Sequence, residues 1–193
     1  MNTLIFATNN QNKVVEVRSI LNGRFKIKTL CEAGINIDIP EPFDTIEENA
    51  IEKASVIYNL TKENCFAEDT GLETEALNGE PGVKSARYAG EERSFEKNID
   101  KLLDNLKNKE NRKARFKTII CLILDGKEII FDGICNGTII AERKGNSGFG
   151  YDPVFIPDGA DKTFAQMTME EKNIFSHRNK AMKKLTQYLK TLK

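Results

Sequence analysis

Several features that mark common classes of protein are missing from this chain of 193 residues. Its 29 basic and 29 acidic residues cancel, so no global field of one sign favours nucleic acid or an anionic membrane. No stretch approaches the roughly 18 apolar residues of a membrane-spanning helix. The start, MNTLIFATNN, lacks the charged and long apolar parts of a signal peptide. These absences predict a soluble, cytoplasmic protein that binds neither nucleic acid nor a membrane.

Cysteine and histidine are scarce as well. The four cysteines, at positions 31, 65, 121 and 135, lie far apart and form no CxxC pair, which disfavours a zinc site or a disulfide framework. We expect all four to be reduced and most to be core thiols. The single histidine, His177, is accompanied by no serine or cysteine in a recognisable nucleophile setting, so a catalytic triad is set aside. A lone histidine is more often structural than catalytic.

The length fits one domain with a substantial core, and no repeat, low-complexity stretch or linker interrupts residues 1–193. Apolar runs predict short strands at 3–7, 26–30, 65–67 and 154–156. Asp125-Gly126 predicts a hairpin between strands that begin at 114 and 127, the second of them long. Helical spacing and caps predict helices from Lys13 to Gly23, from Thr45 to Leu60, over 95–106, after Thr168 and after Ser176.

The segment 65–90 (CFAEDTGLETEALNGEPGVKSARYAG) contains a notable pair of side chains. Glu68 and Asp69 stand side by side at the end of a short apolar strand, and the turn signal Thr70-Gly71 is expected to end that strand. Two carboxylates in this position can hold a divalent metal or activate water. Taken alone, the pair fits solvated residues leading into a loop at least as well.

Two helix starts carry a cation, where the helix dipole disfavours positive charge. Lys13 follows the polar loop 8–12 (TNNQN), and Arg178 follows Ser176 and His177. Both positions make sense if the two side chains point at one anionic ligand, because the free amides of a helix start also bind phosphate. An asparagine-rich loop that simply forms a turn is the alternative.

Three further features each allow a structural and a functional interpretation. Glu41 lies between two prolines, which could fix its carboxylate in place, although exposed loop glutamates are more common. Asn49 and Lys53 share one helix face, which is either exposed or turned into a cleft. The loop 145–153 (GNSGFGYDP) matches neither familiar phosphate-binding glycine motif. It is a flexible loop, or its glycines let the backbone approach a ligand on which Phe149 stacks.

Four motifs stand in one order along the chain: Thr8-x-Asn10-x-x-Lys13, 68–72 (EDTGL), 148–153 (GFGYDP) and Ser176-His177-Arg178. With 48–50 (ENA) and 82–90, they make the chain closely resemble the HAM1-like nucleoside triphosphate pyrophosphatases, also called inosine triphosphate pyrophosphatases. The resemblance covers essentially the whole chain, and the bacterial branch looks nearest. Phe175 and Asn179 depart from the family's usual residues, which affects the expected fine geometry around the base.

The resemblance implies an α/β fold with a long, twisted mixed sheet flanked by helices, in two lobes around a central active-site cleft. It implies Mg²⁺-dependent hydrolysis of the non-canonical purine triphosphates ITP, dITP and XTP to the monophosphate and pyrophosphate. That reaction cleans the nucleotide pool and prevents incorporation into DNA and RNA. Members of the family are usually homodimers, so a homodimer is expected here.

The same resemblance assigns roles to residues. The triphosphate would contact Thr8, Asn9, Asn10, Gln11, Asn12, Lys13 and Lys53, and Thr70 would be a further substrate contact. Mg²⁺ would bind Glu41, Glu68 and Asp69, and Asp69 would act as general base or orient the water; which of Glu68 and Asp69 does which is open. The base would contact Phe149, Gly150, Tyr151, Asp152, Lys172, His177 and Arg178. Hydrogen-bond donors aimed at the 6-oxygen of the base would face the amine of adenine when ATP enters. This mismatch can discriminate against ATP by roughly 10⁴-fold.

Three alternatives remain at this point. One is a pyrophosphatase that prefers other modified or canonical nucleotides. Another is a nucleotide sensor without turnover, against which the intact Glu68, Asp69 and Lys13 argue. The third is an RNA-binding module that uses the basic segment 112–117, which the neutral net charge disfavours.

Overall fold

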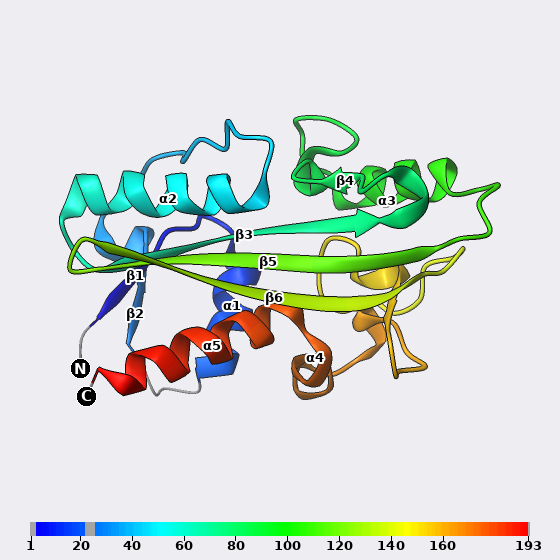
Figure 1. Ribbon diagram of the computed structural model, residues 1–193. Helices are drawn as coiled ribbons and strands as arrows, with labels where there is room; N and C mark the ends of the chain where they lie inside the picture. The colour runs from blue at the N-terminus through cyan, green and yellow to red at the C-terminus, as the bar shows by residue number, and fades with distance from the viewer. Residues whose placement is uncertain (1–2, 22–25, 193) are drawn as a thin grey trace. The chain divides into compact units, whose positions relative to one another are not determined.

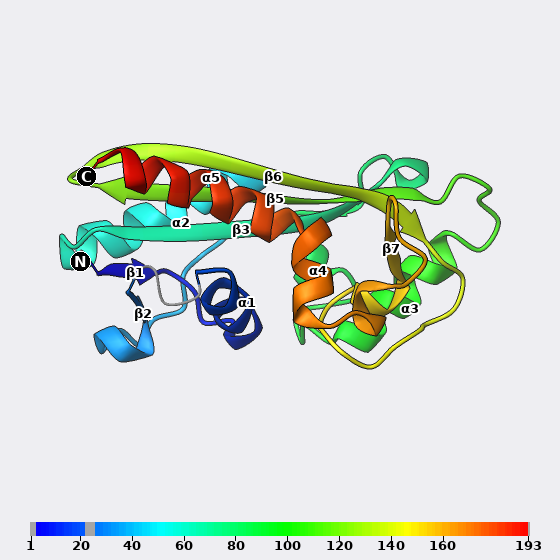
Figure 2. The same ribbon diagram turned by 90° about the horizontal axis from the view of Figure 1, so that it is seen from below.

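The computed structural model describes residues 3–21 and 26–192. In these residues a twisted seven-stranded sheet has the order β2-β1-β3-β5-β6-β7, with β4 paired to β3 (Figures 1 and 2). The strands are β1 (Leu4–Phe6), β2 (Ile27–Thr29), β3 (Cys65–Thr74), β4 (Pro81–Gly82), β5 (Lys113–Leu124), β6 (Lys127–Ile139) and β7 (Phe155–Pro157). The α-helices are α1 (Gln11–Leu21), α2 (Ile46–Thr61), α3 (Phe95–Asn105), α4 (Met169–Phe175) and α5 (His177–Thr191).

The sheet is mixed, as the family resemblance implied. β1 runs parallel to β2 and to β3, with Phe6 opposite Phe66. Parallel neighbours need long crossover connections, and α1 and α2 lie in the segments that link these strands. β4 is antiparallel to β3 and β7 is antiparallel to β6, with Thr138 opposite Ile156. The α/β class is therefore confirmed.

The chain divides into two compact units. Unit 1 comprises residues 1–69, 118–133 and 178–193, and unit 2 comprises residues 70–117 and 134–177. β3, β5 and β6 each contribute residues to both units. A single domain over residues 1–193, with lobes around a central cleft, stays a prediction.

The core of unit 1 follows from the apolar faces of its elements. α1 and α5 pack their apolar stripes against Phe6, Phe66 and Ile120 of the strands. α2 lies on the opposite side of the sheet from α5 (Figure 1). Its apolar stripe is buried: Ile46, Ala50, Ala54 and Ile57. Thr45 caps α2 by accepting the N–H of Glu48, as the sequence predicted.

The core of unit 2 is rich in aromatic side chains. Phe116, Phe155 and Phe164 pack together with Leu102 of α3. Two helix caps form here: Ser94 accepts the N–H of Lys97, and Thr168 forms a capping box with Glu171. The hairpin also forms, with Asp125-Gly126 joining the two long strands β5 and β6.

One prediction about β3 was wrong. Thr70-Gly71 does not end the strand, which continues to Thr74. The reason is tertiary: Leu72 and Glu73 pair with β4, and Leu72 is fully buried. The chain turns later, at Asn78-Gly79, where both residues have positive φ. Pro81-Gly82, a dipeptide typical of turns, forms β4 itself, and Gly23, predicted to end α1, lies outside the described residues.

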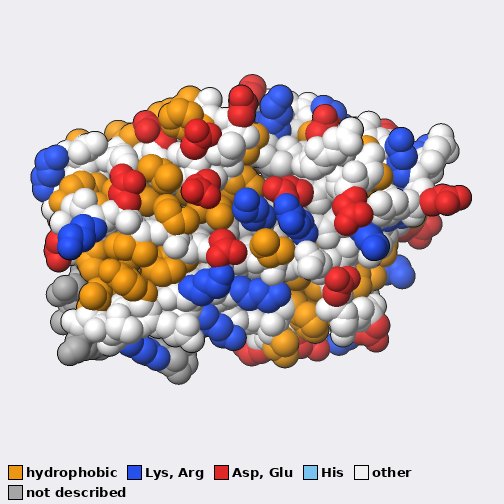
Figure 3. Space-filling view, viewed as in Figure 1, with side chains coloured by type: hydrophobic (Ala, Val, Ile, Leu, Met, Phe, Trp, Pro, Cys, Tyr) orange, Lys and Arg blue, Asp and Glu red, His pale blue; other side chains and the backbone are white. Residues whose placement is uncertain are grey.

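The cysteines and the surface agree with the composition. All four cysteines are reduced thiols, and Cys65, Cys121 and Cys135 are buried whereas Cys31 is exposed. Positive and negative side chains are interspersed over the face in Figure 3, in line with the zero net charge. Across the described residues, every helix is too short or too polar to cross a membrane.

Candidate active site

In the loop between β1 and α1, side chains accept hydrogen bonds from the backbone N–H groups that lead into α1. Thr8 Oγ1 accepts the N–H of Asn10 at 3.1 Å. Asn10 Oδ1 accepts the N–H groups of Asn12 at 3.0 Å and Lys13 at 3.3 Å. Asn10 thus caps α1, because its side chain satisfies two of the amides that a helix start leaves open. The other phosphate contacts predicted in the loop and the first turn of α1 are exposed: Asn9, Gln11 and Asn12.

The side chain of Lys13 belongs to a row of alternating charges whose other members are buried. Its Nζ lies 3.2 Å from Glu68 Oε1. Arg178, in the first turn of α5, donates from Nε to the two oxygens of Glu68 at 3.0 and 2.8 Å, and from Nη2 to Oε1 at 2.9 Å. Its Nη1 donates to Glu16 Oε2. We call Lys13, Glu68, Arg178 and Glu16 the ionic row.

A second ammonium, that of Lys53, is buried between two carboxylates. Lys53 Nζ is 2.8 Å from Glu41 Oε1 and 2.8 Å from Asp69 Oδ1. The shared face of α2 is therefore turned inward, which settles the alternative that its pattern left open. Asn49 fixes the preceding loop by accepting the N–H of Phe43 at 3.0 Å and donating to its carbonyl at 2.8 Å. These contacts bring Glu41 and Asp69 to one cation.

The adjacent carboxylates Glu68 and Asp69 have opposite electrostatic environments. Burial alone would raise the pKa of Glu68, but Arg178 and Lys13 outweigh it and lower that pKa to about 2. Burial raises the pKa of Asp69, and the charge of Lys53 does not fully offset it. Burial also lowers the pKa of Lys13, whereas the carboxylates around Lys53 overcome burial and raise its pKa. Asp69 is thus the better proton acceptor of the two neighbours.

In unit 2, Asp152 organises the glycine loop. Its Oδ2 accepts the N–H of Phe149 at 2.9 Å and Lys172 Nζ at 2.5 Å. Gly148 has a φ of +76°, and a Cβ there would overlap Asp152 Oδ2, so glycine is needed for this contact. Lys172 Nζ lies 5.4 Å from the centroid of the Phe149 ring, within reach of a cation–π contact.

Two predicted base contacts are part of the packing of unit 2. His177 is 3% exposed and stacks on Phe116, with ring centroids 4.7 Å apart. Tyr151 is buried and its hydroxyl donates to the carbonyl of Ser85 at 2.9 Å. Gly150, the residue before Tyr151, adopts a φ of +62°. The packing supports a structural role for both side chains, and their contact with a base stays a prediction.

Two residues beside these clusters were missed by reasoning from the sequence. Glu16 is 3% exposed and reaches Arg178; its signal was the three-residue spacing from Lys13, which puts both on one side of α1. Phe95, at the start of α3, has its ring centroid 6.1 Å from that of Phe149. No local pattern connects residues so far apart in the sequence.

The metal prediction rests on a small set of ligands. Within the part of the chain that is described, no group of three or more His, Cys, Asp or Glu side chains is arranged to hold a metal. Glu41 and Asp69 nevertheless face one shared cation, the Lys53 ammonium. Mg²⁺ takes oxygen ligands and binds through one or two carboxylates plus substrate phosphates, so this pair fits it.

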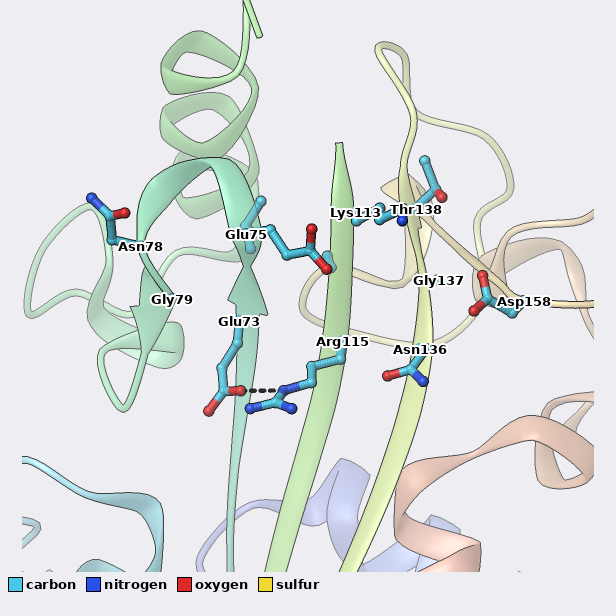
Figure 4. A pocket seen from close by; sticks show the side chains of 12 residues that line it. Glu73, Glu75, Asn78, Gly79, Lys113, Arg115, Asn136, Gly137, Thr138 and Asp158 are labelled. Atoms are coloured by element: carbon cyan, nitrogen blue, oxygen red, sulfur yellow. Dashed lines mark hydrogen bonds and ion pairs between the residues drawn. The ribbon is translucent and has the colours of Figure 1, made fainter. Parts of the chain in front are cut away.

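A separate pocket of about 580 Å³ lies in unit 2 (Figure 4). It is lined from β3, β5 and β6, and the Glu73–Arg115 ion pair at 2.5 Å lies in it. Among its described lining residues there is none of the site residues predicted from the sequence. The pocket is therefore not part of the candidate site.

Comparison with known proteins places the chain in a family. The model of the Ham1 family matches residues 4–188. The chain belongs to the Ham1 family. A relative from Flavobacterium psychrophilum, named dITP/XTP pyrophosphatase, is 51% identical over 187 residues, which are 97% of this chain and 98% of that protein. Another of the same name, from Flavobacterium johnsoniae, is 50% identical over 190 residues, covering 98% and 99%.

A solved structure supports the same assignment for this Ham1 family member. The Ham1 protein of Staphylococcus aureus matches it with a TM-score of 0.90 at 39% identity, over 100% of both chains. The family resemblance inferred from the four motifs is confirmed. The roles assigned to individual residues of this Ham1 chain stay predictions.

Proposed function

We propose that this Ham1 protein hydrolyses dITP, XTP and ITP to the nucleoside monophosphate and pyrophosphate. The observation that carries the proposal is the pairing of Lys13 with Glu68 and of Lys53 with Asp69. It places two ammonium groups beside two adjacent carboxylates. Ammonium groups bind phosphate oxygens and carboxylates activate water. The names of the relatives, dITP/XTP pyrophosphatase, agree with this chemistry.

Unit 1 supplies the phosphate contacts in this proposal. Lys13 exchanges Glu68 for a phosphate oxygen, and its partly open side chain, 14% exposed, can reach one. Lys53 adds a second cation. The polar groups of unit 1 expected to contact the phosphates are those of Thr8, Asn9, Asn10, Gln11 and Asn12. Thr70, the first residue of unit 2, is a further proposed substrate contact.

Asp69 is the proposed general base. It accepts a proton from the water that attacks the α-phosphorus, and the bond to the oxygen bridging to the β-phosphorus breaks as pyrophosphate leaves. Glu68 suits this role less, because Arg178 occupies both of its oxygens. A base with a raised pKa accepts a proton more readily near neutral pH, which is the direction found for Asp69.

The residues that would hold Mg²⁺ are Glu41 and Asp69, with Glu68 as a third candidate. Glu41 and Asp69 already share one cation. Glu68 would become a ligand only by giving up contacts to Lys13 or Arg178. When bound, the metal would neutralise the charge that develops on the departing pyrophosphate.

Unit 2 and the start of α5 supply the base contacts. Phe149 stacks on the purine, and Lys172, held by Asp152, donates to the 6-oxygen that inosine and xanthine carry. Adenine presents an amine at that position, so a donor would face a donor and ATP would bind poorly. The remaining proposed contacts are Gly150, Tyr151, His177 and Arg178.

The wider setting follows from this activity. Damaged purine triphosphates arise in the nucleotide pool, so we place the protein in the cytoplasm, where it prevents their incorporation into DNA and RNA. We also propose a homodimer, on the family resemblance. Sedimentation analysis tests the dimer directly: a single species with the mass of one chain refutes it.

The function is tested by incubation with dITP, XTP, ITP, GTP, ATP and dUTP, each with and without Mg²⁺. We expect monophosphate and pyrophosphate in equal amounts from dITP, XTP and ITP, and little product from the others. Release of single phosphates, or equal rates on ATP and ITP, refutes the proposal. Activity undiminished by a chelator refutes the metal requirement alone.

A further inference from the structure

Glu16 is a buried carboxylate to which the proposed reaction gives no role. It lies on α1, one turn after Lys13, and is 3% exposed. Its Oε2 accepts a hydrogen bond from Arg178 Nη1. A carboxylate is kept ionised in such a place by a partner of opposite charge. Glu16 therefore ties α1 to the first turn of α5.

The ionic row begins and ends on α1. Lys13 contacts Glu68, Glu68 contacts Arg178, and Arg178 contacts Glu16. Lys13 and Glu16 are three residues apart and so lie on one side of the helix. The row thus connects α1, β3 and α5. β3 also carries Asp69, and α5 begins with His177.

The guanidinium of Arg178 donates hydrogen bonds to two carboxylates, and its bond to Glu16 sets which nitrogens remain for Glu68. Lys13 Nζ and two nitrogens of Arg178 approach the same atom, Glu68 Oε1, at 3.2, 3.0 and 2.9 Å. Glu16 draws the third guanidinium nitrogen toward α1. Without that contact, the guanidinium can move further onto Glu68 and displace the ammonium of Lys13.

We propose that Glu16 is a positioning residue for the hydrolysis reaction: through Arg178 it fixes Glu68, and through Glu68 it fixes Lys13 and the neighbouring Asp69. This inference rests on the proposed function. Glu16 also balances charge, because the two cations of the row face two carboxylates. Removing its charge leaves the row net positive, which attracts a triphosphate while its groups are displaced.

The first test is Glu16→Gln. We expect kcat for dITP to fall by about 10- to 100-fold, the effect of displacing reacting groups by about 1 Å, while KM stays the same or falls. Glu16→Asp keeps the charge and should recover part of kcat. A matched control is Glu32→Gln, which removes the partner of Arg18 at an exposed pair and should change neither constant. A raised KM with normal kcat overturns the proposal.

The second test asks whether Glu16 acts through Arg178. If it does, Glu16→Gln combined with Arg178→Gln loses no more kcat than Arg178→Gln alone, because nothing is left to position. Losses that multiply overturn the proposal. If Glu16→Gln does not fold, Glu16→Asp takes its place in the same cycle, with the same two outcomes.

Failure of this inference can be told apart from failure of the proposed function. The wild-type protein alone tests the function, on dITP and XTP. An inactive wild type refutes the function and the role of Glu16 together. An active wild type with unchanged kcat in Glu16→Gln and Glu16→Asp refutes only the role of Glu16.

Discussion

Unit 1 and unit 2 accommodate buried charge in different ways. In unit 1, cations and carboxylates alternate along the ionic row, and Lys53 sits between two carboxylates. In unit 2, the Asp152–Lys172 pair lies among aromatic rings, with Lys172 Nζ 5.4 Å from the Phe149 centroid and 5.2 Å from that of Phe164. The first arrangement is a series of coupled ions, and the second is one ion pair against apolar surface.

This difference has a consequence for the proposed reaction. Removing one member of a series of buried ions leaves the charges of its neighbours uncompensated. The effects of substitutions in unit 1 on kcat should therefore be non-additive. An aromatic surface contributes contact area and stacking, which act on binding. We therefore expect changes in unit 1 to lower kcat and changes in unit 2 to raise KM and alter the choice of base.

The largest effect is expected for Asp69→Asn. Loss of the proton acceptor should lower kcat by about 10²- to 10⁴-fold with KM for dITP little changed. Steady-state kinetics and a nucleotide-binding titration measure the two quantities. Glu73→Gln, on the same strand, is the matched control and should retain wild-type rates. A near-normal kcat in Asp69→Asn would show that another group takes the proton.

Gly148→Ala should have the next largest effect, in unit 2. The added Cβ overlaps the Asp152 carboxylate, which separates it from Phe149 and Lys172, so KM should rise about 10- to 100-fold. Gly79→Ala is the control, because Gly79 also has a positive φ but space around it. Both should lose about 1–2 kcal/mol of stability to backbone strain. Equal KM values for the two variants would refute the role of the Asp152 contacts.

Phe149→Ala tests stacking alone. Loss of a stacking contact of about 1–3 kcal/mol should raise KM for dITP about tenfold, with kcat nearly unchanged. Phe43→Ala removes an exposed aromatic ring from unit 1 and should leave KM as it is. If kcat falls in Phe149→Ala and KM does not change, the division of roles between the two units is wrong.

The smallest effect on activity is expected at two buried asparagines that hold loops in the same way. Asn49 bonds the N–H and carbonyl of Phe43, and Asn98 bonds the N–H of Ala89 and the carbonyl of Ala86. Either change to alanine should cost about 2–3 kcal/mol in urea unfolding, for two hydrogen bonds. Only Asn49→Ala should slow hydrolysis, by a few-fold, because its loop carries Glu41. Equal slowing in both would indicate a global effect.

Local signals in the sequence predicted much of the fold. The caps at Thr45, Ser94 and Thr168 accept the amides expected of them, and Asp125-Gly126 closes the long hairpin. These features depend on contacts within a few residues. The continuation of β3 was missed because it depends on pairing with β4, which no local pattern shows.

The sequence predicted which residues belong to the candidate site better than it predicted the contacts between them. The motifs pointed to Lys13, Glu68, Asp69 and Arg178 before any contact was known. The sequence did not show that Arg178 would bind Glu68 on both oxygens. It also left open whether Lys53 was exposed, although Lys53 is buried between Glu41 and Asp69.

The sequence by itself determined the family, the order of the elements and the identity of the charged groups, because motif spacing and periodicity are properties of neighbouring residues. Tertiary structure alone decided which charges pair. Glu16 and Arg178 are 162 residues apart in the sequence. The residues around a helical glutamate do not indicate whether its carboxylate faces water or a guanidinium. Folding buries both groups, and burial makes their pairing necessary because an unpaired charge in the interior is strongly unfavourable.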